Sequence, residues 1–160
     1  METVKIGMAE LAVLKNPGVL ITLGLGSCVG VAVYDPVNKI AGLAHVMLPE
    51  SPKNKKVINE AKFADTALPA LVNKIQLLGG NNRYLRAKIA GGAQMFVFKD
   101  KTDLMRIGEK NVIAVRNILK KLNIKLEAEH TGGNYGRSIE FYSETGKMLI
   151  KTIGHGLVEI

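Results

Sequence analysis

Apolar and polar positions alternate in short blocks near the start of the chain, a pattern that predicts several successive β-strands. Four apolar runs are separated by turns containing Gly, Pro, Asn or Asp; they cover residues 11–14, 19–23, 29–34 and 40–47. In the third run every second residue is valine, which is typical of a strand buried on at least one face. The first two runs flank Asn16-Pro17-Gly18, a turn sequence that predicts a β-hairpin.

The spacing of apolar residues changes to that of a helix after a polar and basic loop at 51–56. Between Val57 and Leu78 apolar residues recur every three or four positions, which predicts an amphipathic helix ended by Gly79-Gly80. Pro69 marks either a kink in this helix or the first turn of a second one. The same periodicity predicts another helix over roughly 108–122.

The rest of the chain returns to strand-like alternation and predicts four further strands, at 85–89, 124–130, 138–143 and 147–153. The last two flank Glu144-Thr145-Gly146 and are expected to form a closing hairpin. In the strand at 124–130, Leu126 and His130 are expected on one face. The order of elements predicts an α+β fold, with packed mixed or antiparallel β-sheets in a sandwich-like core flanked by helices. Residues 1–160 are expected to form a single domain, because a chain of this size can bury a core without metals or disulfides.

Composition restricts the compartment and the partners. The chain has one cysteine and no apolar run near the roughly 20 residues that cross a bilayer. Residues 1–10 lack the pattern of a secretory signal peptide, so none is expected. We therefore expect a cytoplasmic protein without membrane insertion. The net charge of +8 suits nucleic acid, an anionic membrane surface or an acidic protein. The basic residues are scattered and no aromatic residues are interleaved with them, which argues against nucleic acid and leaves an acidic protein partner open.

A glycine-rich turn, Gly24-Leu25-Gly26-Ser27-Cys28-Val29-Gly30, follows the second apolar run. A dinucleotide-binding turn would have to open a helix, whereas alternating valines continue this segment as a strand. No Gly-Lys-Ser or Gly-Lys-Thr sequence exists that could form a phosphate-binding loop. The pattern thus argues against nucleotide binding at this turn.

The same turn holds the only cysteine, Cys28, which is a candidate nucleophile. Backbone N–H groups of the turn around Gly26 and Ser27 are candidates for stabilising an oxyanion. His45, near the end of the next predicted strand, is the candidate base, and the hydroxyl of Thr22 could accept the second hydrogen bond of its ring. An equally simple interpretation is structural: Cys28 as a small buried apolar residue and His45 as a hydrogen-bonded strand-end residue.

The other histidines give no metal-binding pattern. His130 and His155 are far from each other and from Cys28 in sequence, so no metal site is expected. His130 is interpreted as a hydrogen-bonded core residue and His155 as a turn residue. Arg137, at the end of a glycine-rich loop, could bind an anion, although a tight turn explains the glycines equally well.

Several motifs in one order resemble a known family, and together they span nearly the whole chain. They are TLGLGSCVGV (22–31), GLAHVMLP (42–49), GGAQM (91–95), IGEKN (107–111) and TGGNYGR (131–137). These motifs are similar to those of the chemoreceptor glutamine deamidases, the CheD family of bacterial chemotaxis. One departure is visible: where the family usually has an acidic residue two positions before the Gly-Gly pair, this chain has His130.

The resemblance implies an amidohydrolase that converts particular glutamines of methyl-accepting chemotaxis receptors to glutamate and releases ammonia. It implies Cys28 as nucleophile, His45 as base and Thr22 as the third member of a triad, with no cofactor. It also implies packed β-sheets with outer helices, and a CheC-type chemotaxis phosphatase as partner. The alternative is a regulatory binding protein that docks on and stimulates this phosphatase, with the deamidase activity secondary.

Overall fold

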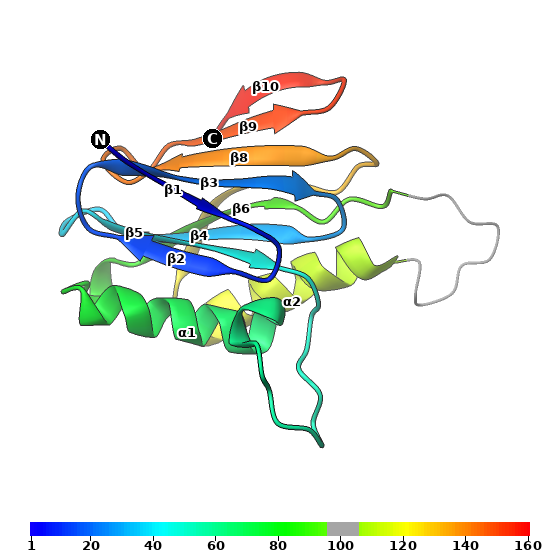
Figure 1. Cartoon of the computed structure of the whole chain (residues 1–160), viewed down its shortest axis with the longest axis horizontal. Helices are drawn as coiled ribbons and strands as arrows, with labels where there is room; N and C mark the ends of the chain where they lie inside the picture. The colour runs from blue at the N-terminus through cyan, green and yellow to red at the C-terminus, as the bar shows by residue number, and fades with distance from the viewer. Residues whose placement is uncertain (96–105) are drawn as a thin grey trace.

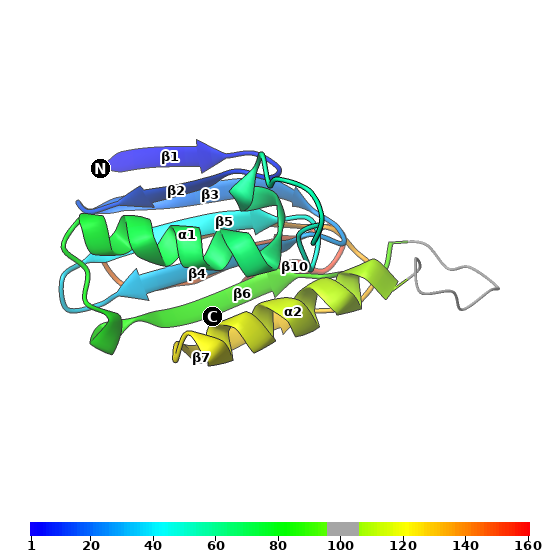
Figure 2. The ribbon, with the colours of Figure 1, turned by 90° about the horizontal axis from the view of Figure 1, so that it is seen from below.

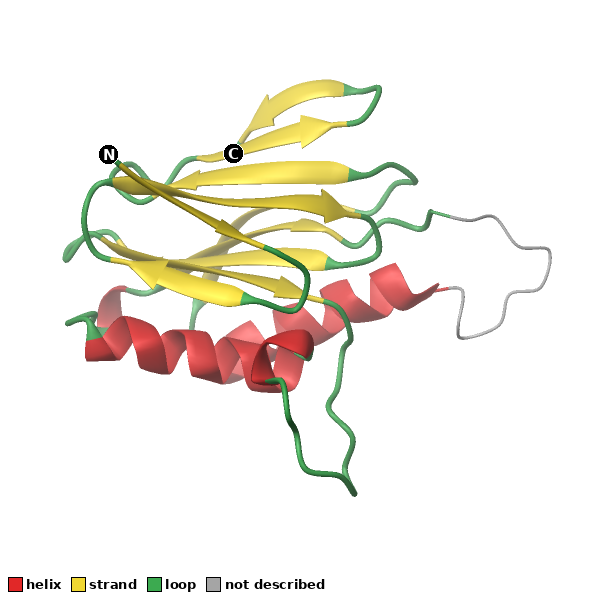
Figure 3. Cartoon of the chain, in the orientation of Figure 1, coloured by secondary structure: helices red, strands yellow, loops and turns green. Residues whose placement is uncertain are grey.

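Two five-stranded β-sheets pack face to face, and two α-helices cover the outer face of one of them (Figures 1 and 3). The structure is a computed structural model that describes residues 1–95 and 106–160. In these two ranges the sheets are mixed, which confirms the predicted α+β class. No helix in the described part of the chain is long and apolar enough to span a membrane.

The sheet without helices, here called sheet A, has the strand order β1-β3-β8-β9-β10. Its first two strands are parallel and its other neighbours are antiparallel. The strands are β1 (Glu2–Ile6), β3 (Gly18–Leu25), β8 (Arg137–Tyr142), β9 (Met148–Thr152) and β10 (Gly156–Glu159). The predicted closing hairpin is confirmed as β8 and β9, whereas β1 and β10 were not singled out by the apolar pattern.

The other sheet, here called sheet B, has the order β2-β5-β4-β6-β7. The strands are β2 (Leu11–Leu14), β5 (Ile40–Val46), β4 (Val29–Asp35), β6 (Arg86–Gly91) and β7 (Lys125–Thr131). Every residue of β4 and β5 is buried, because sheet A covers one face of these strands and the helices cover the other. This double burial explains their nearly continuous apolar sequences.

The helices α1 (Ala64–Leu77) and α2 (Ile107–Lys121) lie side by side on sheet B (Figure 2). Their apolar stripes form one core with the outward-facing valines of β4, and a second core fills the space between the sheets. The first helix begins later than its periodicity predicts, after a 3₁₀ turn at Glu60–Lys62, and Pro69 lies inside it. Neither a second helix starting at Pro69 nor a start at Val57 is found.

The predicted N-terminal hairpin is wrong. The strands β2 and β3 do not pair with each other: β2 pairs with β5 in sheet B, and β3 pairs with β1 and β8 in sheet A. The turn at Asn16-Pro17-Gly18 carries the chain from one sheet to the other. Turn chemistry identifies where a chain reverses, but it does not show which strand will supply the hydrogen-bond partners.

The predicted common face of Leu126 and His130 is also wrong. An irregularity in the pairing of β6 and β7 lies between Leu126 and Ala128, and it shifts the alternation of the strand. Leu126 packs against the helix-side core, while His130 contacts Arg137 of sheet A. A single extra residue in one strand therefore turns the later side chains to the opposite face.

Candidate active site

Cys28 lies just before β4, where the chain has crossed from sheet A to sheet B. Its side chain belongs to the core between the sheets, together with Ala32 and Tyr34 of β4. The residue is 7% exposed, so it lies at the border of this core rather than in its centre. The thiol is therefore turned away from the helices.

His45 reaches the same inter-sheet space from the neighbouring strand β5. It pairs with Gly30 in the ladder of β4 and β5, which places Cys28 diagonally across from it on the same face. Residues in diagonal positions are about 7–8 Å apart, within reach of longer side chains. Packing between the sheets favours glycine at position 30, because a Cβ there would lie 2.6 Å from Ile139 Cδ1. The strands β4 and β5 are thus neighbours, as the prediction requires, and they bring Cys28 and His45 to one face of sheet B.

Thr22 approaches His45 from the opposite sheet. Its Oγ1 lies 2.8 Å from His45 Nδ1 and 3.0 Å from the carbonyl oxygen of Ile6, to which it donates. A threonine hydroxyl has one hydrogen, so with that hydrogen on Ile6 it can only accept from the ring. This hydrogen-bond network assigns the proton to Nδ1 and leaves the lone pair on Nε2.

The free nitrogen of His45 is the one that a base needs. Nε2 is buried and has no hydrogen-bond partner among the described residues. Burial lowers the pKa of His45 below its ordinary value and raises the pKa of the Cys28 thiol. Both effects disfavour charge, so the resting pair at neutral pH is a neutral thiol and a neutral imidazole.

The turn that carries Cys28 is held by three bonds to its carbonyl groups. Ala93 N–H donates to Gly26 C=O at 2.9 Å, and Gly92 N–H donates to Cys28 C=O at 2.8 Å. The Asn111 side chain donates to Ser27 C=O at 2.9 Å. These partners come from the end of β6 and from α2, so the carbonyl groups of the turn are engaged on the side of sheet B and the helices.

The strand β1 contributes to the site although no motif pointed to it. Ile6, its last residue, pairs with Thr22 and supplies the carbonyl that takes the hydroxyl hydrogen. The next segment also fixes His45, since Ala9 N–H donates to His45 C=O and His45 N–H donates to Glu10 C=O. An acceptor in the backbone leaves no signature in the sequence, which is why this contribution was missed.

Asn111 is the second residue that sequence reasoning did not assign. It is completely buried, and its Nδ2 also donates to Met47 C=O at 2.9 Å. A weak signal exists: Asn111 is a polar residue on the same helical stripe as the apolar Val112, Val115 and Leu119. A polar side chain on a buried stripe usually has a specific hydrogen-bonding role.

The other sequence candidates form a separate group around Tyr135. Arg137 is 1% exposed; its Nε donates to His130 Nδ1 at 2.9 Å and its guanidinium lies over the Tyr135 ring. The His155 ring stacks on Tyr135, with centroids 4.2 Å apart. His130 is half-buried and hydrogen-bonded, and His155 lies in a turn as predicted. In the described ranges, no three His, Cys, Asp or Glu side chains are close enough to hold a metal ion.

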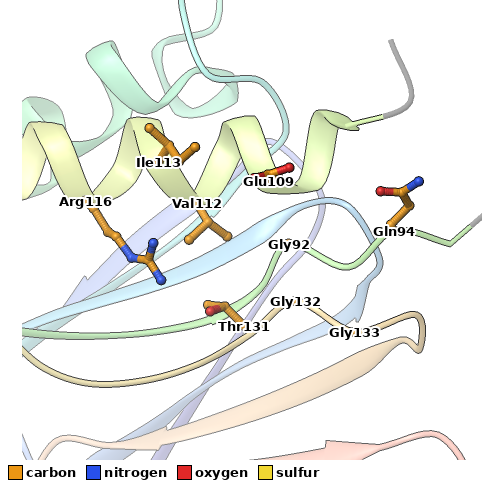
Figure 4. Close-up of a pocket in the computed structure, with 9 residues that line it drawn as sticks. All are labelled: Gly92, Gln94, Glu109, Val112, Ile113, Arg116, Thr131, Gly132 and Gly133. Carbon is orange, nitrogen blue, oxygen red and sulfur yellow. The ribbon is translucent and has the colours of Figure 1, made fainter. Parts of the chain in front are cut away.

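A cavity of about 360 Å³ opens on the helix side of sheet B, between α2 and the ends of β6 and β7 (Figure 4). Gly92, whose N–H holds the Cys28 carbonyl, forms part of its wall. Arg116 extends from α2 toward the strands and binds Glu129. Cys28, His45 and Thr22 do not line this cavity, so it is adjacent to the candidate site but distinct from it.

Comparison with known proteins agrees with the motif pattern. Residues 47–152 match the family described as CheD chemotactic sensory transduction. A protein of Caldanaerobacter subterraneus subsp. tengcongensis named "Probable chemoreceptor glutamine deamidase CheD" is 56% identical over 153 residues, which cover 96% of this chain and 94% of that protein. A protein of the same name from Clostridium botulinum is 51% identical over 160 residues and covers 100% of this chain and 99% of its own length.

A solved structure supports the architecture alone. The Bacillus licheniformis hypothetical protein YfiH superposes with a TM-score of 0.50 at 16% identity, covering 76% of this chain and 50% of that one. Similarity at this level concerns the fold and not the chemistry. The family match and the full-length relatives together show that this chain belongs to the CheD family of chemotactic sensory transduction proteins.

Proposed function

We propose that this protein deamidates glutamine side chains of chemotaxis receptors, with Cys28 as nucleophile, His45 as base and Thr22 as the residue that orients the imidazole. One observation carries the proposal: Thr22 fixes the Nδ1–H tautomer of His45, leaving Nε2 unpartnered on the face it shares with Cys28. The names of the full-length relatives supply the substrate class.

In the first half of the reaction, Nε2 of His45 takes the thiol proton while the Cys28 sulfur attacks the carboxamide carbon of glutamine. The carbonyl oxygen gains the electron pair of the broken π bond, and backbone N–H groups of the turn at Gly26, Ser27 and Cys28 stabilise it. The tetrahedral intermediate collapses as His45 gives its proton to the nitrogen. Ammonia leaves, and a thioester joins Cys28 to the former glutamine.

In the second half, water replaces ammonia. His45 removes a proton from water as the water oxygen attacks the thioester carbon, and the collapse of the second intermediate breaks the carbon–sulfur bond. The sulfur recovers the proton through His45, and the product is a glutamate side chain. The atoms balance as amide plus water giving carboxylic acid plus ammonia, so the reaction needs no cofactor.

The basic surface suits this substrate. Receptor methylation regions are helical and rich in glutamate, and a net charge of +8 would steer the protein toward them. The single cysteine, which has no disulfide partner, fits the reducing cytoplasm in which these regions lie. A CheC-type phosphatase as binding partner is proposed on the family resemblance alone.

A second candidate function is a regulatory binding protein that docks on this phosphatase with a vestigial Cys28. The burial of Cys28, which raises its thiol pKa, is the observation that favours it. Ammonia release from a receptor fragment separates the two candidates, because a protein whose Cys28 is vestigial should release none.

The direct test is ammonia release from the cytoplasmic fragment of a methyl-accepting chemotaxis receptor. Wild-type protein should release ammonia, and the folded Cys28→Ala variant should release none. The matched control is Ser143→Ala, which removes a buried hydroxyl in the turn after β8 and should stay active. Normal turnover by Cys28→Ala would exclude the cysteine mechanism.

A further inference from the structure

Asn111 links the two segments that carry the nucleophile and the base. Its Nδ2 donates to the carbonyl of Ser27, directly before Cys28, and to the carbonyl of Met47, two residues after His45; both distances are 2.9 Å. The amide orientation follows from these contacts, because the flipped amide would place an oxygen against two carbonyl oxygens. One side chain on α2 therefore ties the end of β5 to the start of β4.

Asn111 also lowers the stability of the fold through its amide oxygen, which argues for a role other than general stability. Asn111 is completely buried, and its Oδ1 has no hydrogen-bond partner among the described residues. An unsatisfied buried acceptor costs about 1–3 kcal/mol. A side chain kept mainly for packing would not need to carry this penalty.

The position of Asn111 is itself fixed by a close helix–strand contact. Gly108, one turn earlier on α2, lies so near the end of β6 that a Cβ there would be 2.7 Å from the carbonyl oxygen of Gly92. Gly92 in turn donates to the Cys28 carbonyl. The start of α2, the end of β6 and the nucleophile turn thus form one contiguous packed unit.

Peptide geometry connects the Ser27 carbonyl to the amide of Cys28. The two groups belong to one planar peptide unit, and no peptide bond in the described ranges is cis, so C=O and N–H point in opposite directions. Asn111 draws the carbonyl toward α2, on the outer face of sheet B. The Cys28 N–H is then directed to the other side, where the Cys28 side chain faces the inter-sheet space.

Two observations agree with this direction. The Cys28 N–H is close enough to its own sulfur to lower the thiol pKa, opposing the larger effect of burial. The hydrogen bonding between the chain segments at the start of β4 and the end of β6 is also incomplete. Gly92 N–H donates to Cys28 C=O, but Cys28 N–H donates to no backbone carbonyl among the described residues. The amide is thus left available for another acceptor.

We propose that Asn111 is a positioning residue that aims the Cys28 N–H at the oxyanion formed when the Cys28 sulfur attacks the substrate. This inference rests on the proposed function, since it concerns one of the oxyanion donors of that reaction. It also explains why the side chain spans Ser27 and Met47: the donor and the base are held in one frame.

The test uses Asn111→Leu, which removes both donors with little change in volume, and Asn111→Ala as a second variant. We expect kcat for ammonia release to fall at least about tenfold, toward the 10²–10³-fold cost of losing a whole oxyanion donor. KM for the receptor fragment should not change. Val115→Ala, which trims a buried residue one turn along α2, is the matched stability control and should keep its kcat.

Alkylation of Cys28 by iodoacetamide distinguishes a positioning role of Asn111 from a general structural role, because loss of structure would change alkylation and deamidation together. Alkylation displaces iodide and forms no oxyanion, so the Asn111 variants should lose much less of their alkylation rate than of their kcat. Unchanged kcat, a parallel loss of alkylation and deamidation, or failure of both variants to fold would overturn the proposal. Activity of Cys28→Ala would instead refute the proposed function, so the two failures are distinguishable.

Discussion

The hydrogen bond between Thr22 and His45 yields the sharpest single-residue prediction. In the wild-type protein the Thr22 hydroxyl accepts a hydrogen bond from His45 Nδ1 and donates one to Ile6 C=O. Thr22→Val keeps the shape of the side chain and removes only this hydroxyl. In the variant, nothing holds the proton on Nδ1. The imidazole can move its proton to Nε2, and that tautomer cannot accept a proton from the Cys28 thiol.

The expected loss follows from the value of one buried hydrogen bond. Leaving a buried polar group unpaired costs about 1–3 kcal/mol, and if this cost falls on the transition state the rate decreases about 5- to 150-fold. Two buried groups lose their partner, Nδ1–H and the Ile6 carbonyl, so we also expect the free energy of unfolding to fall by about 2–6 kcal/mol. Thr22 is completely buried, which makes rescue by bulk water inefficient.

The assay compares Thr22→Val with Thr22→Ser, which retains the hydroxyl. Ammonia release from a receptor cytoplasmic fragment gives kcat/KM, and urea denaturation gives the free energy of unfolding. Thr22→Ser should retain most of the activity and Thr22→Val should lose it. Equal activity of both variants, under conditions where both are folded, would refute the role assigned to the hydroxyl.

Three further predictions concern charge and packing. Burial lowers the pKa of His45, so below the ordinary value of 6.5 the unfolded state binds more protons than the folded state, and the free energy of unfolding should fall as the pH drops through that range. Urea denaturation should show a weaker dependence of this free energy on pH for His45→Gln than for the wild type. The same dependence in both proteins would contradict the lowered pKa. Gly30→Ala should lose about 1–3 kcal/mol of unfolding free energy through overpacking between the sheets, measured in urea, because its Cβ would lie 2.6 Å from Ile139; unchanged stability would contradict this packing. Association with a glutamate-rich receptor fragment should slow as salt is raised, in stopped-flow measurements, and a salt-independent rate would exclude steering by the net charge of +8.

The apolar pattern predicts most elements because burial controls it. The valines of β4 and the helical stripe of α2 face cores, and both elements are found close to their predicted bounds. The pairing of strands is a different matter. The sequence around Asn16-Pro17-Gly18 is that of a turn in either case, and only the partners of β2 and β3 decide whether it closes a hairpin or changes sheets.

The candidate site was accessible from sequence to the extent that its chemistry lies in side chains. Residue type and spacing make Cys28, His45 and Thr22 candidates, and the family resemblance implies their roles. The structure brings Thr22 and His45 within hydrogen-bond distance. The carbonyl of Ile6 and the direction of the Cys28 amide are backbone properties, which the sequence does not encode locally. Asn111 lies outside the glycine turn and reaches it only through the packing of α2 on sheet B.

The central claim is that Cys28 carries the conversion of receptor glutamines to glutamates. Mass spectrometry of a receptor cytoplasmic fragment, incubated with wild-type protein or with Cys28→Ala, measures this conversion at each glutamine. Wild-type protein should raise the mass of particular glutamine-containing peptides by the roughly one dalton that separates an amide from an acid, and Cys28→Ala should leave all of them unchanged. The same mass increase with the folded Cys28→Ala protein would contradict the account.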